Sequence, residues 1–179
     1  KRRLAQKLTF LKQETMPGDP TEQELLDFYE SNKAKYFMPP TYSFKHHYFS
    51  KESNAIERAN NSLNALIDGD MELTGDPFFL GKNFNQNTAA EIERSFGASF
   101  LPAFDQPKLN QWSGPHESAF GEHLLFITDT SDGFFPPWNK IAAKVTQDYV
   151  TKTQDDAVNL YLNEIKSQYR VIINPNYQF

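Results

Sequence analysis

The stretch that decides the fold is residues 112–125, which read Trp-Ser-Gly-Pro-His-Glu-Ser-Ala-Phe-Gly-Glu-His-Leu-Leu. Residues 112–120 have the pattern of a strand, Gly121 allows a tight bend, and residues 122–128 alternate as a second strand. The alternation of the second strand gives one face three inward side chains, namely His123, Leu125 and Ile127. This stretch predicts a hairpin with a histidine on its apolar face.

A further strand is predicted upstream, over residues 41–50. Its apolar face carries four side chains, Tyr42, Phe44, His46 and Tyr48, and its other face carries Ser43, Lys45 and His47. A second histidine therefore also lies on an apolar strand face.

The four histidines of the chain fall into two groups. His46 and His123 are in phase with apolar neighbours, whereas His47 and His116 are out of phase and are expected on the solvent side or at the periphery. As a purely structural pair, His46 and His123 would bond to each other or to nearby hydroxyls. A metal site is disfavoured, because no carboxylate or third histidine stands at ligand spacing.

Helical patterns surround these strands. Two capping boxes, at residues 21–24 and 88–91, each place a glutamate three residues after a threonine and open a helix. We expect helices over residues 1–14, 21–38, 54–67, 88–96 and 138–169, helical turns over 99–104, an irregular segment over 71–87, and a closing strand over 170–173.

This order predicts an α+β fold, with a small antiparallel-dominated sheet surrounded by helices and a helical layer made by the N- and C-terminal segments. We divide the chain into N-terminal helices (residues 1–39), a sheet-containing domain (40–131) and a C-terminal segment (132–179). The C-terminal segment is expected to pack its long helix and short strand with the N-terminal helices.

Composition excludes several classes of function. A net charge of −5 argues against a nucleic-acid partner, which needs a basic face. The absence of cysteine removes disulfides, thiolate zinc sites and cysteine nucleophiles, and no apolar run is long enough to span a bilayer. Phosphate-loop, nucleophile-elbow, zinc-protease and dinucleotide motifs are missing, so no cofactor is expected. Because the chain opens on Lys1 rather than Met, we interpret it as a processed fragment whose signal or anchor would lie upstream.

Residues 44–50 and 112–125 resemble the first strand and the final hairpin of parvulin-type (PpiC or rotamase) peptidyl-prolyl cis-trans isomerases. The hairpin has the family's Ser-Gly-Pro, then Ser/Thr, then Gly-x-His pattern. Phe96 and Phe100 fall where parvulins place the apolar pair that lines the proline pocket. The resemblance covers residues 40–130, and the flanking helices are similar to the chaperone portion of SurA- or PrsA-like proteins.

The resemblance implies cis-trans isomerisation of X–Pro bonds in unfolded or proline-containing clients. It implies an extracytoplasmic location, in the periplasm or cell envelope, and is compatible with an upstream membrane anchor. It assigns the catalytic network to His46, His123 and Ser118, and substrate binding to Phe96, Phe100, Phe120 and Phe79. No basic loop for phosphate is present, which predicts apolar, non-phosphorylated substrates.

One departure from the family pattern leaves alternatives open. Parvulins carry Cys or Asp in a segment that is shortened here to residues 70–74, and Asp76 or Asp70 is the candidate replacement. A catalytically weak or inactive parvulin-fold chaperone would use the same pocket. A scaffold domain held by the long terminal helix is a third hypothesis.

Overall fold

The computed structural model describes residues 18–52, 54–69 and 75–168. Within them the chain forms two compact units, residues 37–135 and a second unit made by residues before 37 and after 135. The helix predicted over residues 1–14, the closing strand over 170–173, and Asp70 with the shortened segment lie outside the described residues. The α+β prediction is confirmed.

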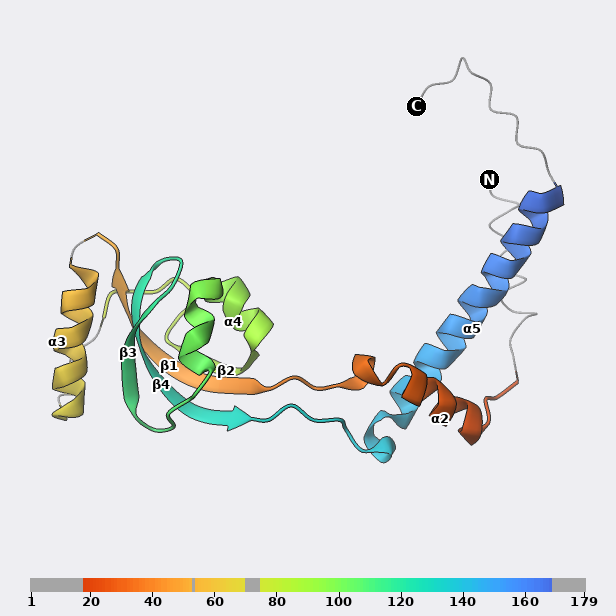
Figure 1. The fold of residues 1–179 in the computed structure, drawn as a ribbon, viewed down its shortest axis with the longest axis horizontal. Helices are drawn as coiled ribbons and strands as arrows, with labels where there is room; N and C mark the ends of the chain where they lie inside the picture. Colours follow the sequence, from red (N-terminus) through yellow and green to blue (C-terminus); the bar gives the residue numbers. More distant parts are fainter. Residues whose placement is uncertain (1–17, 53, 70–74, 169–179) are drawn as a thin grey trace, which may run out of the picture. The chain divides into compact units, whose positions relative to one another are not determined.

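The unit formed by residues 37–135 is built on a four-stranded antiparallel sheet (Figure 1). Its strands are β1 (Thr41–Ser50), β2 (Asn83–Thr88), β3 (Trp112–Glu117) and β4 (Gly121–Ser131), in the order β2-β1-β4-β3. In the β1–β4 ladder His46 lies opposite Leu125, and Tyr48 lies opposite His123. Because opposed residues of an antiparallel pair share a face, the register places both histidines on one face as diagonal neighbours.

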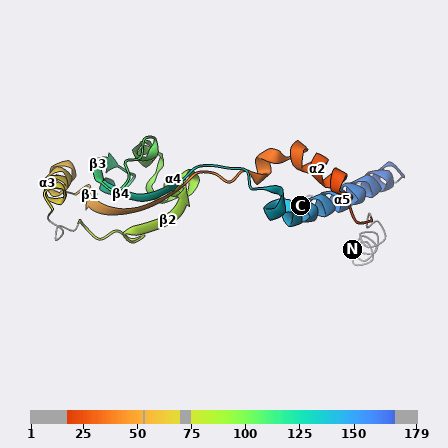
Figure 2. The same ribbon diagram turned by 90° about the horizontal axis from the view of Figure 1, so that it is seen from below.

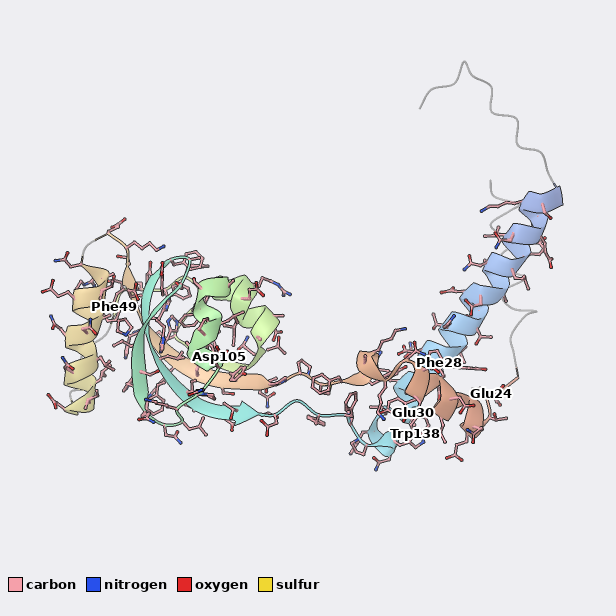
Figure 3. All side chains as sticks on the ribbon, viewed as in Figure 1. Glu24, Phe28, Glu30, Phe49, Asp105 and Trp138 are labelled. Atoms are coloured by element: carbon pink, nitrogen blue, oxygen red, sulfur yellow. The ribbon has the colours of Figure 1, made fainter. Side chains whose placement is uncertain are left out.

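Helices cover the two faces of this sheet (Figure 1). The α3 helix (Ala55–Ile67) packs over Phe49 and Leu124, and Figure 3 shows Phe49 beside it. The α4 helix (Ala89–Phe96) and the 3-10 helix η2 (Ala98–Phe104) cover the other face, which is the face of the histidines. The predicted capping box of α4 is present.

Several elements of this unit differ from the prediction. The segment predicted to be irregular contains β2, whose polar sequence Asn-Phe-Asn-Gln-Asn-Thr has little strand propensity but pairs with β1 as an edge strand. The β3 strand ends at Glu117 rather than Phe120, so that residues 118–120 form the turn. Gly121 begins β4, where a Cβ atom would clash with the Phe49 carbonyl oxygen.

The second unit packs α2 (Glu22–Ser31) and the 3-10 helix η1 (Lys33–Tyr36) against α5 (Trp138–Gln168), as Figure 2 shows for α2 and α5. The helix predicted over residues 21–38 therefore ends at Ser31. Tyr36, Ile141 and Val145 form its buried core, with Phe28 and Trp138 beside them (Figure 3). Even the 31 residues of α5 include no stretch apolar enough to cross a membrane, and the same holds for the other described helices.

Candidate active site

Two buried histidines meet at the centre of the sheet. The Nδ1 atoms of His46, on β1, and His123, on β4, lie 2.8 Å apart, and both side chains are shielded from solvent. The strand register described above brings them together. The structure thus gathers two of the residues that the sequence predicted for the site.

A chain of hydrogen bonds runs through this pair. His46 Nε2 lies 3.0 Å from the Gly81 carbonyl oxygen, and His123 Nε2 lies 2.7 Å from Ser118 Oγ. The Ser118 hydroxyl also accepts backbone N–H bonds from Phe120 and Gly121 in the β3–β4 turn. Ser118, the third predicted catalytic residue, therefore joins the network and holds the turn.

The Gly81 carbonyl oxygen fixes which atoms donate and which accept in this hydrogen-bond network. A carbonyl oxygen only accepts, so His46 Nε2 carries a proton and donates to Gly81. A neutral His46 then accepts at Nδ1 from His123 Nδ1–H, and His123 Nε2 accepts from the Ser118 hydroxyl. With this pair of neutral tautomers, every nitrogen atom of the two imidazoles has a hydrogen-bond partner.

The environment keeps both imidazoles uncharged. Burial lowers the pKa of His46 to about 4, with the nearby His47 and Lys82 acting in the same direction and the bond to Gly81 opposing them. Burial lowers the pKa of His123 to about 3, and the neighbouring His46 and His116 lower it further. Both histidines are therefore neutral at pH 7 and act as hydrogen-bonding groups rather than as cations.

Aromatic rings enclose the pair. The Phe96 ring contacts both imidazoles edge-on, each at 5.4 Å between ring centroids, and the Phe100 ring lies 5.0 Å from that of His123. Phe84, from β2, lies 5.5 Å from His46. Phe96 and Phe100 are completely buried, so in this structure they belong to the core as well as to the surroundings of the histidines.

Phe78 also contacts the histidine pair, although no sequence motif indicated it as a candidate residue. Its ring meets His46 at 5.0 Å and His123 at 5.3 Å, both edge-on, and it stacks on Phe96 at 5.3 Å. The available signal was the apolar triplet Phe78-Phe79-Leu80 in an otherwise polar segment.

The other predicted substrate-binding residues form an exposed rim. Phe79 is 69% exposed and Phe120 is 38% exposed, and their rings contact each other at 5.0 Å. Phe78 touches both rings. The structure thus joins the buried Phe96 and Phe100 to the exposed Phe79 and Phe120 through Phe78.

Asp76 does not face the histidines in this structure. Its carboxylate accepts hydrogen bonds from both terminal guanidinium nitrogens of Arg58, and from the Ser50 backbone N–H at 2.8 Å. These bonds lower the pKa of Asp76 to about 2, led by the bond from Arg58. The geometry gives this carboxylate a structural role that ties residue 76 to α3 and to the end of β1.

The remaining histidines lie outside the pair. His47 is half-buried and stacks on Trp112 at 4.7 Å, and His116 bonds to the Ser113 hydroxyl at 3.1 Å. Within the described residues, no group of three or more histidine, aspartate or glutamate side chains is arranged to hold a metal ion. A groove of about 760 Å3 between α3 and the start of β4 includes none of the predicted site residues.

Comparison with protein families finds a match over most of the chain. Residues 20–143 match the model of the PPIC-type peptidyl-prolyl isomerase (PPIase) domain. The chain belongs to this family. The suspected parvulin relationship is thereby confirmed, and the chain is of the peptidyl-prolyl cis-trans isomerase type. No curated protein matches the chain in sequence.

Solved structures of similar fold accompany this match. A structure from the study of PEB4 and Cj1289, two SurA-like chaperones of Campylobacter jejuni, has 15% sequence identity and a TM-score of 0.59, and the match covers 96% of this chain and 69% of that one. PrsA of Bacillus subtilis has 12% identity and a TM-score of 0.37, with 94% of this chain and 62% of that chain covered. The chain spans less than two thirds of the length of this PrsA. At 15% identity the likeness to the Campylobacter jejuni structure concerns the fold.

Proposed function

We propose that this isomerase acts on X–Pro bonds of extracytoplasmic client proteins, with an apolar residue before proline and no requirement for phosphate. The observation that supports the proposal most is the neutral, fully hydrogen-bonded pair of His46 and His123 inside an aromatic enclosure. Rotation about an X–Pro bond breaks no covalent bond, so a site without nucleophile or metal suffices.

The proposed mechanism lowers the cost of twisting the amide. The barrier of roughly 18–20 kcal/mol arises from C–N resonance, which is lost when the amide leaves planarity. A twisted amide is less polar than a planar one, so a water-excluding aromatic surface favours it. Phe96 and Phe100 would provide that surface, and the exposed Phe79 and Phe120 would hold apolar residues beside proline.

The histidine pair would form the floor beneath the rotating amide. Its two imidazoles are locked in one tautomer each, with Ser118 fixing the end of the network. A rigid neutral floor preserves the shape of the site without adding a charge that would hold water at the carbonyl. In this proposal His46, His123 and Ser118 keep their predicted roles.

The proposed selectivity follows from the surroundings of the pair. Phenylalanine rings surround the histidine pair. Lys82 is close enough to help lower the pKa of His46. A single lysine is not the arginine cluster that phosphate recognition uses. The extracytoplasmic location is supported by the SurA-like chaperones of similar fold, of which Cj1289 is described as periplasmic. The helical unit of α2 and α5 would contribute contacts to unfolded clients.

A second candidate function is a chaperone with little or no turnover. Two observations favour it: Phe78 covers the histidine pair, and the Asp76 carboxylate is engaged by Arg58. Exchange NMR on peptides with leucine, glutamate or phosphoserine before proline separates the two. We expect catalysed exchange, fastest for the leucine peptide. Binding of unfolded chains with exchange at the uncatalysed rate would support the chaperone instead.

A further inference from the structure

The segment of residues 76–81, here called the strap, passes over the histidine pair and is fixed at both ends. At its start, the Asp76 backbone N–H donates to the Tyr48 carbonyl at 2.6 Å, and its carboxylate binds Arg58. At its end, the Gly81 carbonyl accepts from His46 Nε2, and the Gly81 N–H donates to the Phe78 carbonyl at 3.0 Å. The strap is thus tied directly to the network that it covers.

The three apolar side chains in the middle of the strap differ in direction. Phe79 is 69% exposed and Leu80 is 44% exposed, whereas Phe78 is only 8% exposed. The Phe78 ring is nearly parallel to that of Phe96, with an angle of 11° between the planes, and nearly perpendicular to both imidazoles, at 89° and 88°. It therefore fills the space bounded by His46, His123 and Phe96.

This is the space that the substrate's proline ring needs. In the proposed function the proline contacts the aromatic wall and the histidine floor, and Phe78 already occupies both sets of contacts. Protein interiors are packed too closely for two rings to share one such space. Phe96 is completely buried while Phe78 is in place, so a ligand has no access to it in this state.

We infer that Phe78 is an internal plug of the prolyl site, and that substrates bind only after its ring has left the contacts with Phe96 and the two histidines. The inference rests on the proposed function. Only molecules whose Phe78 ring has moved out can bind substrate. The observed affinity therefore equals the intrinsic affinity multiplied by the fraction of such open molecules. Phe78 thereby sets the affinity without touching the bound proline.

Substitution of the neighbouring residues Phe78 and Phe79 should change the peptide affinity in opposite directions. Phe78→Ala removes the plug and should raise the affinity for an Ala-Leu-Pro-Phe peptide on the order of tenfold, because the open fraction rises toward one. Phe79→Ala removes part of the exposed rim and should weaken binding. Ile67→Ala serves as a surface control, because Ile67 lies at the far end of α3 and is 67% exposed. This variant should leave the peptide affinity unchanged.

The experiment measures peptide affinity by NMR titration and turnover by exchange spectroscopy for the wild type and these variants. N-acetylproline methylamide, a probe with only the proline ring, should bind Phe78→Ala more tightly than the wild type and shift the imidazole signals of His46 and His123. If Phe78→Ala does not fold, Phe78→Leu tests the same point, since leucine fills part of the volume but cannot stack on Phe96.

The outcomes separate the inference from the function on which it rests. Tighter binding by Phe78→Ala or Phe78→Leu, with weaker binding by Phe79→Ala, supports the plug. A catalytically active wild type whose Phe78 variants bind more weakly overturns the plug and makes Phe78 a binding wall, while the isomerase function stands. If neither wild type nor variants bind or isomerise the peptide, the proposed function fails and the inference fails with it.

Discussion

The Nδ1 atoms of His46 and His123 lie 2.8 Å apart, so one of them donates a hydrogen bond to the other. The direction of this bond follows from the Gly81 carbonyl, which requires a donor at His46 Nε2. We therefore predict that His46 is the Nε2–H tautomer and His123 the Nδ1–H tautomer at pH 7. Long-range ¹H–¹⁵N correlation spectra of the imidazoles distinguish the two forms. An Nδ1–H tautomer at His46 would contradict the network.

Stability should fall in mild acid because of this pair. The pKa values of His46, about 4, and His123, about 3, lie below the ordinary value near 6.5, so the unfolded chain binds protons first as the pH drops. The free energy of unfolding should be insensitive to these groups above pH 7. It should decrease between pH 6.5 and 4 by up to about 1.4 kcal/mol per pH unit for each histidine.

Urea unfolding at pH 7.5, 6 and 5 measures this slope. His47→Gln, which removes a half-buried histidine outside the pair, should leave most of the slope in place. His46→Gln should reduce it. A wild-type free energy of unfolding that is the same at pH 7.5 and pH 5 would show that the pair is not buried and neutral as described.

Ser118→Ala should lower stability and turnover together. The change leaves His123 Nε2 without its donor and removes the acceptor for the Phe120 and Gly121 backbone N–H groups. We expect a loss of about 1–3 kcal/mol in the free energy of unfolding, the cost of unsatisfied buried polar groups. Ser113→Ala, which removes a hydroxyl bonded to His116 on the same hairpin, is the matched control. Equal isomerase activity in the two variants would remove Ser118 from the site.

Asp76→Asn should affect stability more than turnover. Its carboxylate is bound by Arg58 and by the Ser50 N–H rather than by the histidines, and the pair is partly exposed, so we expect a loss of about 1 kcal/mol. Arg58→Ala should cost a similar amount, and the double variant should cost less than the sum of the two. The Asp76 backbone N–H still holds the start of the strap to Tyr48, so isomerisation per folded molecule should stay within about twofold of the wild type. A much larger drop in Asp76→Asn alone would assign the carboxylate to the chemistry.

The placement of His46 and His123 on apolar strand faces could be predicted because it depends on local patterns, whereas their contact depends on the β1–β4 ladder. Strand alternation placed each histidine on an apolar face, and the hairpin at residues 112–128 fixed which strand carries His123. The two threonine–glutamate capping boxes likewise depend on residues three apart, and both helices begin where they indicate. Short-range signals of this kind need no knowledge of the tertiary structure.

The inward position of Phe78 and the ion pair of Asp76 could not be predicted because they depend on long-range contacts. Nothing in the triplet Phe78-Phe79-Leu80 indicates which ring turns inward, since the direction is set by Phe96 and the histidines on other elements. The partner of Asp76 lies on α3, and no sequence spacing relates a loop carboxylate to it. The β2 strand was missed because its pairing with β1, not its polar composition, makes it a strand.

The central claim is that X–Pro isomerisation takes place at the histidine pair. The most direct test follows the cis and trans signals of an Ala-Leu-Pro-Phe peptide together with the imidazole signals of His46 and His123 in one NMR titration. We predict exchange above the uncatalysed rate, with both imidazoles shifting over the same range of peptide concentration. Catalysed exchange that leaves both imidazole signals unchanged, or no catalysed exchange at saturating peptide, would contradict the account.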